Sequence, residues 1–156
     1  MLKAAALLSR FGLAAMWLYS GAVKLANPLD SQLAVAGYEL LPENLISPVA
    51  IALPATELIL GLMLLLGVFT RAAAAASAAL LAMFMAAIVW AWSRGLQIDC
   101  GCFGGGGHDP NAGPGTYALA LARDALFLAA AWLTWRPREK PQPRLAGEAP
   151  PAQSGQ

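Results

Sequence analysis

The chain has 156 residues, of which 58% are hydrophobic and 12% charged, and its formal net charge is +1. An average soluble domain is about 45–50% apolar and about 25% charged, so this composition predicts an integral membrane protein in a lipid bilayer. The near-neutral charge, without a basic stripe that carries interleaved aromatic residues, argues against nucleic acid as a partner.

Four apolar segments are each long enough to cross a hydrocarbon core as a helix, which takes about 20 residues. They run over about residues 4–26, 49–69, 72–92 and 116–135. Arg10 interrupts the first segment, and the length of that segment favours a membrane span over a cleaved signal peptide. The sequence therefore predicts an all-α fold, an integral membrane antiparallel four-helix bundle over residues 1–135, with a short outward Cys-Gly-Cys loop.

From Arg136 onward the composition changes to Pro, Arg, Gln, Gly and Glu, so residues 136–156 are predicted to form a disordered cytoplasmic tail. Basic residues flank one end of the bundle: Lys3, Arg71, Arg136, Arg138, Lys140 and Arg144. Only Lys24 and Arg94 flank the spans at the other end. The positive-inside rule then places both termini in the cytoplasm of a bacterium, and the loop between the last two spans outside its inner membrane, in an oxidising compartment.

This outward loop holds the only two cysteines, Cys100 and Cys102, separated by Gly101. Gly101 permits the tight bend that brings the two sulfurs within disulfide distance. A disulfide in so small a ring is labile and closes almost no loop, which suits thiol–disulfide exchange better than structural stabilisation. The sequence therefore predicts Cys100 and Cys102 as a catalytic redox pair, and His108 as a residue that helps to deprotonate a thiol.

Two other interpretations of the loop stay open. Cys100, Cys102 and His108 are ligands that suit zinc or copper, although zinc-binding cysteines usually lie further apart and no fourth ligand is evident, so we favour no metal. Alternatively, the loop docks a soluble protein and the cysteines are accessory. The chain would then be a non-catalytic scaffold or assembly subunit instead of a thiol–disulfide oxidoreductase.

Four charged residues lie in, or at the end of, the outer halves of the spans: Lys24, Glu57, Arg123 and Asp124. Charges inside a bilayer are unfavourable and usually face one another or a cavity. We expect these side chains to converge beneath the cysteine loop, where Lys24 and Arg123 would stabilise a thiolate. A quinone between the helices, with Trp90 and Trp92 near its entrance, is a candidate cofactor. A buried ion-pair network that only fixes the helix register is the alternative.

Several short motifs along the chain carry a resemblance to a known family. They are, in order, Arg10-Phe11-Gly12, Tyr19-Ser20-Gly21, Tyr38-Glu39-Leu40-Leu41-Pro42, Glu57-Leu58, Arg94-Gly95, Cys100-Gly101-Cys102-Phe103-Gly104 and Arg123-Asp124. Together they resemble the methylamine-utilisation protein family MauE, within the broader DoxX-like group of four-helix membrane proteins. The resemblance covers about residues 5–135, and the Cys-Gly-Cys-Phe-Gly stretch is its most specific part.

This resemblance implies a redox-associated membrane protein that works with an extracytoplasmic thioredoxin-like partner of the MauD type. Such a protein would support disulfide formation or maturation of secreted proteins. The four-helix plan is also similar to that of quinone-coupled disulfide-generating membrane enzymes, which is an analogy of fold alone. The glycine run from Gly104 to Gly107 is longer than the family pattern needs, and we expect it to leave the loop free to reach a partner.

Overall fold

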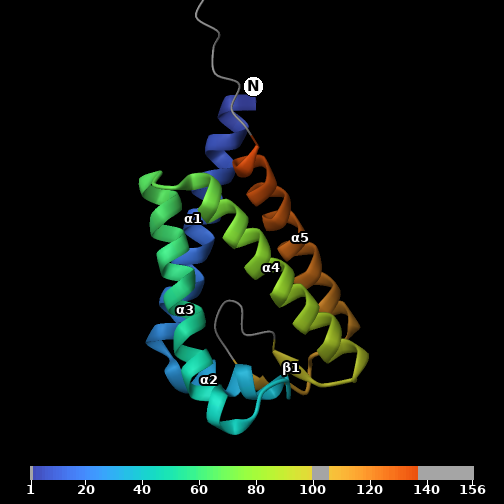
Figure 1. Cartoon of the computed structure of the whole chain (residues 1–156). Helices are drawn as coiled ribbons and strands as arrows, with labels where there is room; N and C mark the ends of the chain where they lie inside the picture. Colours follow the sequence, from blue (N-terminus) through green and yellow to red (C-terminus); the bar gives the residue numbers. More distant parts are fainter. Residues whose placement is uncertain (1, 100–105, 137–156) are drawn as a thin grey trace, which may run out of the picture.

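The computed structural model describes residues 2–99 and 106–136, which form five helices and a two-stranded ribbon (Figure 1). Their order is α1 (Leu2–Ala26), α2 (Pro28–Gly37), α3 (Glu43–Leu66), α4 (Thr70–Ser93), β1 (Ile98–Asp99), β2 (Gly107–His108) and α5 (Pro114–Trp135). Within the described residues, α1, α3, α4 and α5 are long and apolar enough to cross a membrane. The predicted all-α membrane bundle is therefore confirmed. The predicted disordered tail lies, apart from Arg136, outside the described residues.

The four long helices pack mainly as two pairs, α1 with α3 and α4 with α5, and α1 also packs along α5. The pairs lie close together at the end that carries the α3–α4 turn, and they diverge toward the end that carries α2 and β1 (Figure 1). We call the first of these the turn end and the second the hairpin end.

Two glycines allow α1 and α3 to approach closely. A Cβ atom on Gly21 would lie 2.8 Å from the carbonyl oxygen of Pro54, and one on Gly61 would lie 2.8 Å from Leu18 Cγ. Both distances are too short for a side chain, so these positions need glycine. Small residues at helix contacts bring backbones together in membranes, where packing contributes much of the association energy.

The connection between the first two spans contains a helix, α2, although the sequence predicted only a connecting stretch there. Pro28 occupies the first turn of α2, where the missing N–H of proline is not needed. The helix packs on α3 and on β2. Its buried residues, Ser31 and Ala34, face the bundle. Helix α2 therefore forms part of the hairpin end.

The ends of the second span differ from the predicted 49–69. α3 begins at Glu43, directly after Pro42. It ends at Leu66 because Gly67 takes a left-handed conformation (φ 76°) and donates its N–H to the carbonyl of Met63. Glycine adopts this helix-ending conformation without steric penalty. A glycine inside an apolar run thus stops the helix before the run itself ends.

Candidate functional site

The two predicted redox residues, Cys100 and Cys102, lie outside the described residues. The structure describes the chain on both sides of them. β1 and β2 pair antiparallel, with Asp99 opposite Gly107. The two ends of the cysteine segment are therefore held side by side at the hairpin end of the bundle.

Helix α5 anchors this ribbon through Tyr117. The Tyr117 hydroxyl donates a hydrogen bond to the carbonyl of Leu96 and accepts one from the backbone N–H of Ile98 at 3.2 Å. The Tyr117 side chain is buried, and its ring stacks on Trp92 with 6.2 Å between the ring centroids. The strand that leads into Cys100 is thus fixed to the bundle by a buried side chain.

Helix α2 anchors the other strand of the ribbon through glycines. A Cβ atom on Gly106 would lie 2.0 Å from the carbonyl oxygen of Asp30, so this backbone packs directly on α2. Gly107 has a φ of 88°, which favours glycine, and a Cβ atom there would lie 3.3 Å from Leu33 Cβ. These two glycines of the run therefore serve packing instead of lengthening a free loop. His108 follows them on β2 with an exposed side chain.

The predicted charged residues pair two by two. In the first pair, the Lys24 ammonium group contacts Oε1 of Glu57, which ties α1 to α3. The Glu57 side chain is fully buried and that of Lys24 is 11% exposed. Ser20 Oγ donates to Oε2 of Glu57 at 2.9 Å, so both carboxylate oxygens have partners.

The second pair, Arg123 and Asp124, lies within α5. The Arg123 guanidinium contacts Oδ1 of Asp124 from Nε at 2.9 Å and from Nη2 at 2.8 Å. Asp124 is nearly fully buried, and its Oδ2 has no hydrogen-bond partner among the described residues. The arrangement keeps both charges compensated inside a span, as charged residues in a bilayer require.

Several side chains that the sequence reasoning did not assign to the site complete these surroundings. Ser20 lies one helical turn before Lys24, so the sequence spacing could have predicted that both side chains lie on the same face of α1. Phe84 lies with its ring centroid 5.1 Å from Lys24 Nζ, a cation–π distance, and no sequence pattern indicated this contact. The Trp17 indole donates to Ser77 Oγ at 2.9 Å, a buried hydrogen bond that joins α1 to α4.

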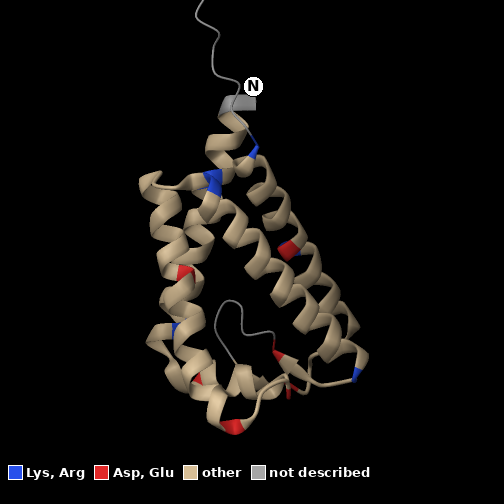
Figure 2. Cartoon of the chain, viewed as in Figure 1, with Lys and Arg blue, Asp and Glu red and all other residues tan. Residues whose placement is uncertain are grey.

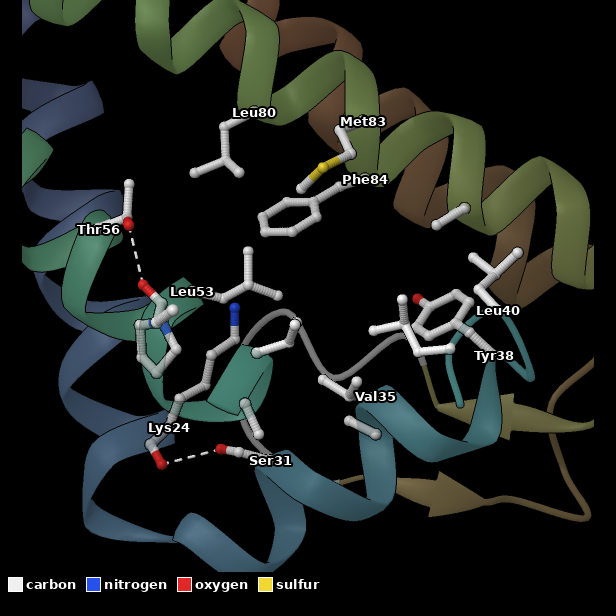
Figure 3. A pocket seen from close by; sticks show the side chains of 17 residues that line it. Lys24, Ser31, Val35, Tyr38, Leu40, Leu53, Thr56, Leu80, Met83 and Phe84 are labelled. Carbon is white, nitrogen blue, oxygen red and sulfur yellow. Dashed lines mark hydrogen bonds between the residues drawn. The ribbon is translucent and has the colours of Figure 1, made fainter. Parts of the chain in front are cut away.

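A cavity of about 500 Å³ lies beside Lys24, between α3 and α4 (Figure 3). Its walls are mostly apolar side chains from α2, α3 and α4, including Val35, Leu53, Leu80, Met83 and Phe84. Among the described residues that line it, Lys24 is the only charged one. Figure 3 shows the Lys24 nitrogen pointing into this space. Trp90 and Trp92, expected near the entrance of a quinone site, are not among the lining residues.

No three metal-ligating side chains (His, Cys, Asp or Glu) come together within residues 2–99 and 106–136. Two of the three residues in the alternative metal site, Cys100 and Cys102, lie outside that part of the chain. Both the redox pair and the metal alternative therefore stay predictions.

Four helices of membrane length, with buried charges paired inside the bundle, define a multi-pass membrane protein. The family model described as methylamine utilisation protein MauE matches residues 2–136, so the chain belongs to the MauE family. This match confirms the resemblance that the motifs carried. No curated protein and no solved structure matches the chain.

Proposed function

We propose that the chain is a membrane thiol–disulfide redox protein in which Cys100 and Cys102 exchange electrons or disulfides with a thioredoxin-like protein outside the cytoplasm. The anchored ribbon is the observation that carries the proposal. It holds both ends of the segment that bears the only two cysteines at one end of the bundle. Membership of the MauE family supports the membrane setting, and the exchange chemistry and the partner are the proposed part.

The exchange follows ordinary thiol–disulfide chemistry. A thiolate of the partner attacks the Cys100–Cys102 disulfide at the Cys100 sulfur, which breaks that bond, forms a mixed disulfide and frees the Cys102 thiolate. The second thiolate of the partner then attacks the partner sulfur that is bonded to Cys100. This forms the partner's disulfide and releases Cys100 as a thiolate. The partner gains a disulfide and loses two electrons and two protons, while Cys100 and Cys102 become a dithiol. The reverse sequence reduces the partner.

The proposed orientation places the hairpin end outside a bacterial inner membrane and both termini in the cytoplasm. In support of it, Figure 2 shows acidic positions gathered at the hairpin end and basic positions at the turn end, although Lys24 and Arg94 also lie toward the hairpin end. The acidic residues there include Asp30, Glu43 and Asp99, and Arg71 lies at the turn end. An excess of basic residues on the cytoplasmic side is the usual determinant of topology.

Trapping of the mixed disulfide tests the proposal. In the direction that reduces the partner, one thiolate of the chain attacks the partner's disulfide and the other resolves the mixed disulfide. Cys102→Ser or Cys100→Ser removes one of these two thiolates, so the variant that keeps the attacking cysteine should accumulate a reductant-sensitive adduct with an oxidised thioredoxin-like protein. The Cys100→Ser/Cys102→Ser variant is the matched control and should form none. If neither single variant forms an adduct, and the double variant leaves the redox state of secreted thiol proteins unchanged, the scaffold interpretation replaces this one.

Alkylation in intact cells tests the orientation separately. After treatment with reductant, a membrane-impermeant thiol reagent should label Cys100 and Cys102, and labelling should fall without reductant because the pair is then oxidised. Labelling that appears only after the membrane is permeabilised would reverse the orientation.

A further inference from the structure

We infer that the cavity beside Lys24 binds an isoprenoid quinone, with a ring carbonyl oxygen accepting a hydrogen bond from the Lys24 ammonium group. The inference rests on the proposed function, because it names the class of molecule that exchanges electrons with the dithiol. The size of the cavity, the Lys24 donor and the aromatic side chain of Phe84 each carry part of the argument.

The size and walls of the cavity suit a lipid-soluble ring. Small-molecule pockets usually enclose about 300–1,000 Å³, and this cavity encloses about 500 Å³. Leu53 on α3 faces Leu80 and Met83 on α4 across it (Figure 3). Both helices are of membrane-spanning length, so a molecule that enters between them comes from the bilayer. A ring with a hydrocarbon tail can pack against these apolar walls without removing polar groups from water.

The polar end of the cavity suits a neutral acceptor. An ammonium group has three N–H donors. Among the described residues, Glu57 is the one hydrogen-bond acceptor of Lys24, so donors remain for a ligand. The Glu57 carboxylate also neutralises the ammonium charge. An anionic headgroup would bring an uncompensated charge into a span, whereas a carbonyl oxygen accepts the hydrogen bond without adding charge.

An aromatic side chain flanks this donor. The Phe84 ring lies over Lys24 Nζ and also lines the cavity. Flat rings gain from offset or edge-to-face packing against an aromatic side chain, which a saturated acyl chain does not. Phe84 thus favours a planar ring over a lipid tail at the position where the Lys24 donor points.

The redox balance calls for an acceptor of this class. When the Cys100/Cys102 dithiol becomes a disulfide, two S–H bonds break, one S–S bond forms, and two electrons and two protons leave. A quinone takes up two electrons and two protons and becomes a quinol. The step is therefore complete without a further oxidant: the dithiol donates the two electrons and the bound quinone accepts them.

The first test measures quinone that copurifies with the protein. Organic extraction and chromatography of the detergent-purified full chain should give close to one quinone per protein. Ala87 lines the cavity, so Ala87→Trp should lower this ratio about tenfold or more, the effect of losing about 1.4 kcal/mol of binding. Its neighbour Ala86 is exposed and does not line the cavity, so Ala86→Trp is the matched control and should retain quinone.

The second test begins with the wild-type protein, so its first result does not depend on whether a variant folds. A photoreactive short-chain azido-quinone, added to the wild-type protein, should label the part of α4 that contains Met83 and Phe84. Unlabelled quinone should compete with this labelling. Lys24→Met/Glu57→Leu removes the donor without leaving a buried charge and should weaken the labelling about tenfold, as loss of a hydrogen bond to a charged group predicts.

The two proposals fail in different ways. The Cys100→Ser/Cys102→Ser variant should keep its quinone although it cannot exchange disulfides, since Lys24, Phe84 and the other described lining residues are unchanged in it. Wild-type protein that carries no quinone and is not labelled in α4 would overturn the quinone site, whatever the trapping experiment gives. Phospholipid that is lost with Ala87→Trp while quinone is absent would also overturn it. Quinone binding without any thiol exchange would overturn the proposed function alone.

Discussion

The ion pair between Lys24 and Glu57 gives a quantitative prediction about stability. Lys24→Met leaves the fully buried Glu57 side chain without its cationic partner, and Glu57→Leu leaves an 11% exposed ammonium group without its anion. Breaking a buried ion pair by removing one partner costs about 3–5 kcal/mol. Each single variant should therefore lose about that much of the free energy of unfolding.

The double variant separates the interaction energy of the ion pair from the effects of the two single substitutions. Lys24→Met/Glu57→Leu leaves neither charge unpaired, and the main remaining cost is the Ser20 hydroxyl, which loses Oε2 of Glu57 as its acceptor. A buried polar group without its partner costs about 1–3 kcal/mol. The double variant should thus be more stable than either single variant, which requires a coupling energy of about 3 kcal/mol or more between the two positions.

Equilibrium unfolding measures these differences. The protein is transferred from mild detergent into increasing fractions of a denaturing detergent, and loss of helix is followed by circular dichroism. Arg94→Met serves as the control, because Arg94 is exposed at the same end of the bundle, and it should change the stability by less than about 1 kcal/mol. Single variants that each lose less than about 1 kcal/mol, with a double variant equal to their sum, would show that the pair does not tie α1 to α3.

Two further predictions concern packing and the ribbon. Gly61→Ala should cost about 1–3 kcal/mol in the same unfolding assay, because its Cβ would lie 2.8 Å from Leu18 Cγ. Gly12→Ala should be neutral or stabilising, since nothing lies within 4 Å of the added atom; equal losses for both would contradict close packing of α1 on α3. Tyr117→Phe should speed hydrogen exchange at the Ile98 amide by about fivefold, as loss of a hydrogen bond of about 1 kcal/mol predicts. An unchanged exchange rate would mean that other contacts hold β1.

The spans were predictable because length and apolar composition alone identify a helix that crosses a bilayer. Their ends were less predictable, since backbone conformation decides them. Gly67 stops α3 by adopting a positive φ, and the sequence alone does not distinguish it from Gly61, which lies inside the same helix. The helix α2 was missed because it is short and its packing surface is formed by other elements, α3 and β2.

The charged residues were predicted as a group, but their partners were not. Pairing across helices depends on how each helix is rotated about its axis, and this rotation follows from contacts such as that of Gly21 with Pro54. The only part readable in advance was the helical spacing of Ser20 and Lys24 on α1. The cavity was also beyond sequence reasoning, because it arises where two helix pairs diverge and is not encoded in any one segment.

Helix α2 connects the cavity with the ribbon. Ser31 Oγ donates to the carbonyl of Lys24 at 2.8 Å, which fastens α2 to the end of α1 that carries the ion pair. Val35 of the same helix lines the cavity, while Asp30 and Leu33 form the surface on which the glycines of the ribbon pack. A ligand that fills the cavity and packs on α2 therefore also stabilises the surface of α2 on which the ribbon packs. By linkage, packing of the ribbon on α2 strengthens binding of the ligand by the same free energy. Occupancy of the cavity and the position of the cysteine segment are thus expected to depend on one short helix.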